Sequence, residues 1–131
     1  FAQNVEVQGG PADLLENRDQ YLPRAPLVRE LAAPRSGWIS GMETRELGMA
    51  VVRLGGGRLQ VEDTIDPRVG LSGLCHLGDR VEANQPLCLI HADNEHDLAH
   101  AAEHIKSAIS ISDSAVEPPP VIVETISGAK E

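Results

Sequence analysis

The sequence predicts an α+β domain in which a small mixed or antiparallel sheet packs against two main helices. Two segments, 44–54 and 94–112, place apolar residues at the three- and four-residue spacing of a helix with one apolar face. Short apolar segments bounded by glycine and proline are typical of strands. The 131 residues suit one domain, and a single Phe, Tyr and Trp leave an aliphatic core.

The first 26 residues predict helical segments and a linker that lie outside the sheet. Residues 1–8 are helix-like, and residues 11–17 begin with proline, which suits a first helical position. Two prolines interrupt residues 18–26, which we interpret as the linker. The chain lacks an initial methionine and starts inside a helix-like stretch, so we expect a preceding domain and place the domain proper at 27–131.

Residues 27–33 predict a strand, and residues 38–40 predict a second strand beside it. We expect the helix that follows to be capped by Thr44, whose hydroxyl can accept a backbone N–H. Glu46 adds a negative charge in the first turn, where the helix dipole favours it.

One apolar face along this helix should pack on the core. Its members are Leu47, Ala50, Val51 and Leu54. Gly55 to Gly57 predict the end of the helix, since glycine readily adopts the left-handed conformation. A phosphate cradle needs a helix N-terminus, and a P-loop ends in Gly-Lys-Ser/Thr, so we interpret the glycines as a helix stop and a mobile loop.

The loop after the glycines contains Glu62, Asp63 and Asp66. They lack the alternating ligand pattern of a calcium loop and predict a solvated loop. Residues 69–77 alternate apolar with small or polar side chains, which predicts a half-buried strand. Residues 87–90 are apolar on both sides and predict a fully buried strand.

The second main helix is predicted at residues 94–112, with Asp93 or Asn94 as its cap. Residues 121–126 then predict a last strand, suited to a sheet edge, because β-branched residues dominate them. From Ser127 onward we expect disorder.

Three histidines, His96, His100 and His104, recur every fourth residue on this helix and could chelate a transition metal. Helical rotation turns them away from the apolar face, so we interpret them as a polar surface stripe that could pick up nickel or zinc at high concentration, and we expect no functional metal site. Cys75 and Cys88 are too few and too separated for a zinc site or disulfide framework. We interpret them as buried thiols in a reducing compartment.

No nucleophile with an identifiable base is apparent, so no catalytic residue and no cofactor are predicted. His76 and His91 lie in strand-like segments, where hydrogen-bonded core histidines are expected. The net charge of −9, with only two lysines, disfavours nucleic acid and anionic membranes as partners. No apolar run approaches the roughly 18 residues of a membrane span.

Several motifs follow one another in a fixed order along the chain. They are Gln8 to Pro11, Tyr21 to Pro23, Gly37 to Arg58, Glu62 to Asp66, Val69-Gly70, Leu77 to Asp79, and Ile90 to Ala92. Together they resemble the C-terminal domain of the thymidine phosphorylase and pyrimidine-nucleoside phosphorylase family. The resemblance covers most of the chain up to about residue 112 and is more specific than any single motif.

This resemblance implies a parent enzyme that reversibly converts thymidine and phosphate to thymine and 2-deoxyribose 1-phosphate. The family's phosphate- and base-binding residues lie upstream, and none can be assigned to a position here. The chain would then be the structural C-terminal domain, inactive alone and monomeric, of a cytoplasmic homodimer. Residues 1–26 would come from the preceding large α/β domain, and phosphate and nucleoside would bind only through the parent.

The resemblance also leads to a prediction about the loop that follows the first main helix. We expect the loop from Gly55 to Val69 to face the parent's cleft and to change its order as the domains close. The glycines Gly55, Gly56 and Gly57 suggest mobility, and Arg58 supplies a cationic tip.

A second hypothesis belongs to a different class of protein. Residues 78–81 and 85–90 are similar to turns of biotinyl and lipoyl carrier domains, which implies a hammerhead-like scaffold related to the barrel-sandwich hybrid. The alternative function is a free-standing, non-catalytic binding module on that scaffold. A carrier needs an exposed lysine on a hairpin tip, but the lysines here are Lys106, expected within a helix, and Lys130, in the tail. The upstream sequence would distinguish the two hypotheses.

Overall fold

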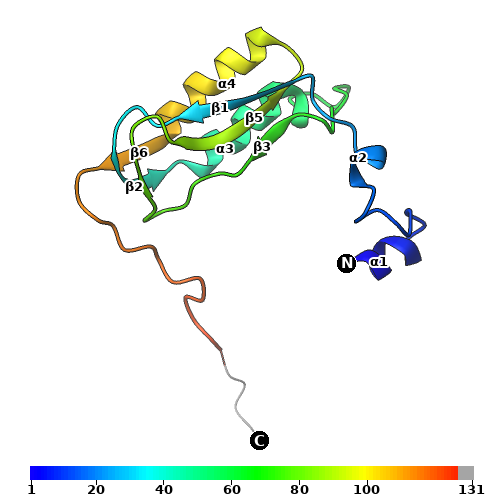
Figure 1. The fold of residues 1–131 in the computed structure, drawn as a ribbon, viewed down its shortest axis with the longest axis horizontal. Helices are drawn as coiled ribbons and strands as arrows, with labels where there is room; N and C mark the ends of the chain where they lie inside the picture. The colour runs from blue at the N-terminus through cyan, green and yellow to red at the C-terminus, as the bar shows by residue number, and fades with distance from the viewer. Residues whose placement is uncertain (127–131) are drawn as a thin grey trace, which may run out of the picture.

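The computed structural model describes residues 1–126 and contains two three-stranded antiparallel sheets beside two main helices (Figure 1). The strand orders are β1-β5-β3 and β4-β2-β6. The elements in chain order are α1 (Ala2–Val7), α2 (Arg18–Tyr21), β1 (Leu27–Ala32), β2 (Gly37–Met42), α3 (Thr44–Val51), the π-helical turn η1 (Val52–Gly56), β3 (Gly70–Ser72), β4 (Arg80–Val81), β5 (Pro86–Ala92), α4 (Glu95–Ala108) and β6 (Ile109–Ser112). The α+β class is confirmed, whereas the hammerhead relationship stays a prediction.

The strand pairing corrects one prediction, because β1 and β2 are not neighbours. β1 pairs with β5, where Leu31 lies opposite Cys88. β2 pairs with β4 and with β6, where Ile39 lies opposite Ile111. Backbone hydrogen bonds between Ala33 and the turn before β5 extend the first pairing beyond the end of β1. Both strands therefore take partners that are distant in the sequence.

Thr44 is predicted to cap α3, but it is the first residue within the helix. Glu43 is the N-cap, and it makes no side-chain capping bond. Its carbonyl accepts the first helical hydrogen bond, from Leu47 N at 3.1 Å, while its own N–H donates to Ala108 O at 2.8 Å. The backbone bond to the end of α4 sets the helix start, so the predicted cap is wrong. Glu46 lies in the first turn as predicted.

The end of this helical segment follows the prediction more closely. After α3, the chain widens into η1 and then turns at Gly55, whose φ of +99° lies in the left-handed region. Leu47, Ala50 and Leu54 are buried, and Val51 is half-buried. The predicted apolar face is therefore confirmed.

Helix α4 is capped by Asn94, whose side chain accepts a hydrogen bond from Asp97 N. The helix ends at Ala108, and the predicted continuation through residues 109–112 is wrong. These residues form β6, which pairs antiparallel with β2. Ile109 lies opposite Met42 in this pairing, so tertiary contacts with β2 override the helical pattern.

The half-buried strand predicted at residues 69–77 is much shorter in the structure. β3 spans only Gly70–Ser72, and Gly73 has a φ of +59°, a turn conformation that ends the strand. The strand predicted at 87–90 is present within β5, although Leu89 is only half-buried.

The two ends of the described chain lie apart from the sheets (Figure 1). The helix expected near the N-terminus is present as α1, but residues 11–17 form turns and the short helix α2 falls inside the predicted linker. The last strand predicted at 121–126 is absent, and these residues pair with no strand in the described part of the chain. The disorder expected from Ser127 concerns residues outside those described.

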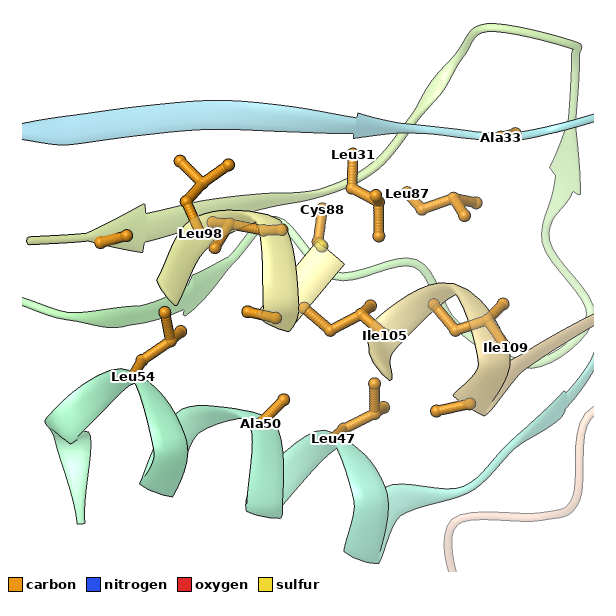
Figure 2. Packing of buried hydrophobic residues seen from close by; sticks show 14 of the residues in the cluster. Leu31, Ala33, Leu47, Ala50, Leu54, Leu87, Cys88, Leu98, Ile105 and Ile109 are labelled. Atoms are coloured by element: carbon orange, nitrogen blue, oxygen red, sulfur yellow. The ribbon is translucent and has the colours of Figure 1, made fainter. Parts of the chain in front are cut away.

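The core is formed by the helices α3, η1 and α4 together with side chains from both sheets, and Figure 2 shows part of it between β1, β5 and the helices. Its buried side chains are Leu31, Ala33, Ile39, Leu47, Ala50, Leu54, Val81, Leu87, Cys88, Ile90, Ala92, Leu98, Ala101, Ile105, Ala108 and Ile109. Small residues at Ala50 and Ala101 suit the close packing of α3 against α4. All of these side chains are aliphatic or a thiol, as the composition predicts.

Candidate functional site

The interior offers no polar chemistry in the described part of the chain. Apart from Gly37, every buried residue among residues 1–126 is hydrophobic, and no buried charged or polar residue occurs there. Within the same range, no group of three or more His, Cys, Asp or Glu side chains is arranged to hold a metal ion. Polar side chains that could form a site therefore lie on exposed loops and faces.

The loop between η1 and β3, residues 57–69, is the candidate that the sequence indicates. Gly55 O accepts a hydrogen bond from Asp66 N at 2.8 Å, which closes the loop at its base. Asp63 Oδ2 accepts from Leu59 N at 2.9 Å and from Gln60 N at 2.8 Å. Asp66 Oδ1 also accepts from Arg68 N at 2.9 Å, so the carboxylates of Asp63 and Asp66 both stabilise the loop backbone, as is common for aspartate in turns.

The glycines at the start of this loop have a packing role that the sequence did not predict. A Cβ on Gly56 would lie 2.8 Å from Val51 Cγ1, and one on Gly57 would lie 2.7 Å from Val52 Cγ2. Both glycines are half-buried against the end of α3. A side chain at either position would collide with a valine, and this packing explains the two glycines better than a need for mobility does.

Arg68 fixes the far end of the loop and was missed by sequence reasoning. Its guanidinium donates to Asp66 Oδ2 and to Asp93 Oδ1, each at 2.7 Å. Hydrogen bonds from Arg68 hold the pKa of the Asp66 carboxyl below its ordinary value. The same interactions raise the pKa of Arg68. The nearby Asp66-Pro67-Arg68 sequence signals a turn, but nothing in it indicates the bond to Asp93.

Arg58 lies beyond these anchors and is exposed to solvent. No hydrogen bond or ion pair of Arg58 occurs among residues 1–126. The structure therefore brings together Gly55, Gly56 and Gly57 at the base of the loop and leaves Arg58 free to meet a ligand or another domain.

The two histidines predicted in the core have different environments. His91 is half-buried, and its Nε2 lies 2.7 Å from Ser72 Oγ on the neighbouring strand. The prediction that His76 lies in the core is wrong, because its side chain is 85% exposed beside Asp79. The early end of β3 places His76 in a surface turn instead of a strand.

The three histidines of α4 line a surface hollow between α4 and the α3–η1 segment. His96 and His100 are exposed, and His104 is half-buried against Arg53, whose Nη1 is 3.2 Å from both ring nitrogens. The predicted polar surface stripe is confirmed for the first two, whereas His104 faces η1.

The cysteines are both free thiols. Cys88 is buried as predicted, and burial raises the pKa of its thiol to about 11. Cys75 is only half-buried, and burial raises its pKa too. Thiols of raised pKa are poor nucleophiles, so neither cysteine is a candidate catalytic group.

Among residues 1–126, no lysine lies on a hairpin as a carrier domain would require. Lys106 lies on α4, where its Nζ pairs with Glu103 at 3.1 Å. Lys130 lies outside the described residues. The tight turn between β4 and β5, residues 82–85, contains no lysine.

The aliphatic core and the exposed, self-stabilised loop define a small domain of the α+β class. Residues 38–112, more than half of the chain, match the model of the pyrimidine nucleoside phosphorylase C-terminal domain. The chain therefore belongs to that family, and the resemblance is confirmed.

A curated relative extends the match over nearly the whole chain. The thymidine phosphorylase of Agrobacterium fabrum (strain C58) is 44% identical over 126 residues, which are 96% of this chain and 29% of the relative. This chain thus spans less than a third of that relative's length. None of the helices formed by residues 1–126 is long and apolar enough to cross a membrane.

Proposed function

We propose that the chain is the C-terminal structural domain of a thymidine phosphorylase. The parent would convert thymidine and phosphate reversibly to thymine and 2-deoxyribose 1-phosphate. The observation that carries this proposal is the 44% identity to a thymidine phosphorylase over 96% of the chain. The boundaries 1–26 for the linking segment and 27–131 for the domain belong to the same proposal.

The domain would buttress the parent's large α/β domain without contributing a catalytic residue of its own. The supporting observation is that no buried polar side chain occurs among residues 1–126, so the interior provides packing alone. Phosphate and nucleoside would be positioned and stabilised by groups elsewhere in the parent. We further propose that the parent is a cytoplasmic homodimer and that this chain alone is a monomer.

The experiment compares three samples in a thymidine phosphorolysis assay. They are the full-length parent, the parent lacking residues 38–112, and this chain alone. We expect turnover by the parent only, because the domain supports a site that lies outside it. Turnover by this chain alone at a parent-like rate would contradict the structural role.

We also propose that the loop from Gly55 to Val69 faces the parent's substrate cleft and orders when the domains close. Arg58 is exposed near the start of the loop, while Asp66 and Arg68 hold its far end. This arrangement suits a loop whose middle responds to a ligand while its ends stay in place. The exposed guanidinium of Arg58 would favour a phosphate or phosphorylated product.

The loop proposal is tested with Arg58→Ala in the full-length parent. We expect kcat/KM for thymidine phosphorolysis to fall, and trypsin cleavage after Arg58 in the unmodified parent to slow when phosphate and thymidine are added. Arg45→Ala is the matched control, since Arg45 is an exposed arginine at the start of α3. Unchanged kcat and KM in Arg58→Ala would remove the proposal.

A further inference from the structure

A hollow of about 280 Å³ lies between α4 and the α3–η1 segment. Its polar lining comes from Arg53, Asp97 and the three histidines of α4, and its apolar lining from Ala50 and Ala101. The α4 side of the hollow is therefore rich in imidazole groups, which are common ligands of transition metals.

Two of these imidazoles lie next to each other. The ring centroids of His96 and His100 are 4.5 Å apart, with the ring planes inclined at 60°. Both residues are exposed, and they are separated by one helical turn. Side chains four residues apart on a helix share a face, so both rings can reach one ion by side-chain rotation alone.

Asp97 sets the orientation of the first ring. Its Oδ1 lies 3.1 Å from His96 Nδ1, and its Oδ2 accepts from Asn94 Nδ2 at 2.8 Å. In the tautomer that carries its proton on Nδ1, His96 donates to Asp97 and keeps the Nε2 lone pair for an ion. Metal-binding histidines usually donate their other ring N–H to such an acceptor.

His104 is excluded from this pair by its neighbour. Arg53 Nη1 contacts both of its ring nitrogens at 3.2 Å, and the guanidinium charge would repel a cation there. This is consistent with the lack of a three-ligand metal group among residues 1–126. His96 and His100 can therefore bind an ion together, whereas His104 cannot join them.

We infer that His96 and His100 form a two-histidine chelate for a divalent transition ion of borderline softness, such as Ni²⁺, Cu²⁺ or Zn²⁺. Asp97 is a positioning residue that holds the tautomer of His96. Water molecules complete the coordination shell, because the pair supplies two of the four or more ligands that such ions need. The bound ion bridges two successive turns of α4 and stabilises its first half.

The test is calorimetric titration of the full chain with NiCl₂ and, separately, with ZnCl₂. We expect one equivalent of ion to bind, and His96→Asn or His100→Asn to weaken binding by more than about tenfold, since each removes a direct ligand. Asp97→Asn should weaken binding by about 10–100-fold, the range found when an outer-shell partner is removed.

His76→Asn is the matched control, because His76 is also exposed beside a carboxylate, that of Asp79, but has no histidine four residues before or after it in the sequence. It should leave the affinity unchanged, and so should His104→Asn. Paramagnetic Ni²⁺ should broaden the amide signals of residues 93–101 before all others. Equal affinity in His96→Asn and the unmodified chain, or an equal loss in His76→Asn, would overturn the inference.

Discussion

Arg68 Nη2 donates to Asp93 Oδ1 at 2.7 Å and so joins the long loop after η1 to the start of α4. The same guanidinium bonds Asp66, whose backbone N–H in turn donates to Gly55 O. The loop is therefore held at both ends by residues that flank it, and its tip lies outside this network. Anchored ends of this kind allow a loop tip to move without disturbing the core.

The first prediction concerns this anchor. Arg68→Ala should increase hydrogen exchange at the amides of residues 59–66, because Asp66 loses the partner that fixes its position. Hydrogen-exchange mass spectrometry measures the effect. Arg29→Ala is the control, since Arg29 bonds Glu95 of α4 at 2.7 Å but has no contact with the loop network. Faster exchange in the control, or none in Arg68→Ala, would contradict the anchor.

The second prediction is the pH dependence of the same anchor. Arg68 holds the pKa of Asp66 below its ordinary value of 3.8. A carboxyl with a lowered folded-state pKa contributes stability that is complete above its unfolded pKa and is lost as pH falls through the folded pKa. Exchange in residues 59–66, corrected for intrinsic rates, should thus stay constant down to about pH 5 and rise below pH 3.8. A rise already between pH 5 and 7 would contradict the pairing.

The third prediction compares two glycines near the same helix. Gly56→Ala should destabilise the domain by about 1–3 kcal/mol, since the new Cβ would overpack against Val51, whose β-branched side chain cannot rotate freely. Gly48→Ala should stabilise it by about 1 kcal/mol, because Gly48 lies within α3 and a Cβ there meets nothing within 4 Å. Urea denaturation measures both. The two substitutions should change the free energy of unfolding in opposite directions, and equal changes would refute the packing role of Gly56.

The faces of the main helices could be predicted from the sequence, whereas strand pairing could not. Leu47 and Ala50 follow a helical period that local geometry alone determines. The partner of β1 is β5, more than fifty residues further on, and no local pattern specifies that pairing. The β-branched run Val121 to Ile126 shows the same limit, because strand propensity yields a strand only where a partner is present.

The candidate site was predictable only in part. The position of the loop and the exposure of Arg58 follow from the glycine stop and the polar composition. The bond between Arg68 and Asp93 joins residues 25 apart in the sequence, and the environment of His104 depends on Arg53 from another helix. Contacts of this kind arise from tertiary packing, and no local sequence pattern around either residue predicts them.

The fourth prediction tests the core between the sheet and α4 (Figure 2). Ile105 is fully buried, so Ile105→Ala should cost about 2–5 kcal/mol through lost burial and the cavity left behind. Ile122→Ala is the control, since Ile122 is 72% exposed, and it should change stability by less than about 0.5 kcal/mol. Thermal unfolding monitored by circular dichroism reports both. Similar melting temperatures for the two variants would contradict the placement of Ile105.

The last prediction distinguishes the two helix starts. Asn94 caps α4 by accepting a hydrogen bond from Asp97 N at 2.9 Å, so Asn94→Ala should cost about 1 kcal/mol. Glu43 occupies the same position in α3 but makes no side-chain capping bond, so Glu43→Ala should change stability by less than about 0.5 kcal/mol. Denaturation midpoints of the two variants provide the comparison. A larger loss in Glu43→Ala would mean that its side chain, and not the backbone bond to Ala108, starts α3.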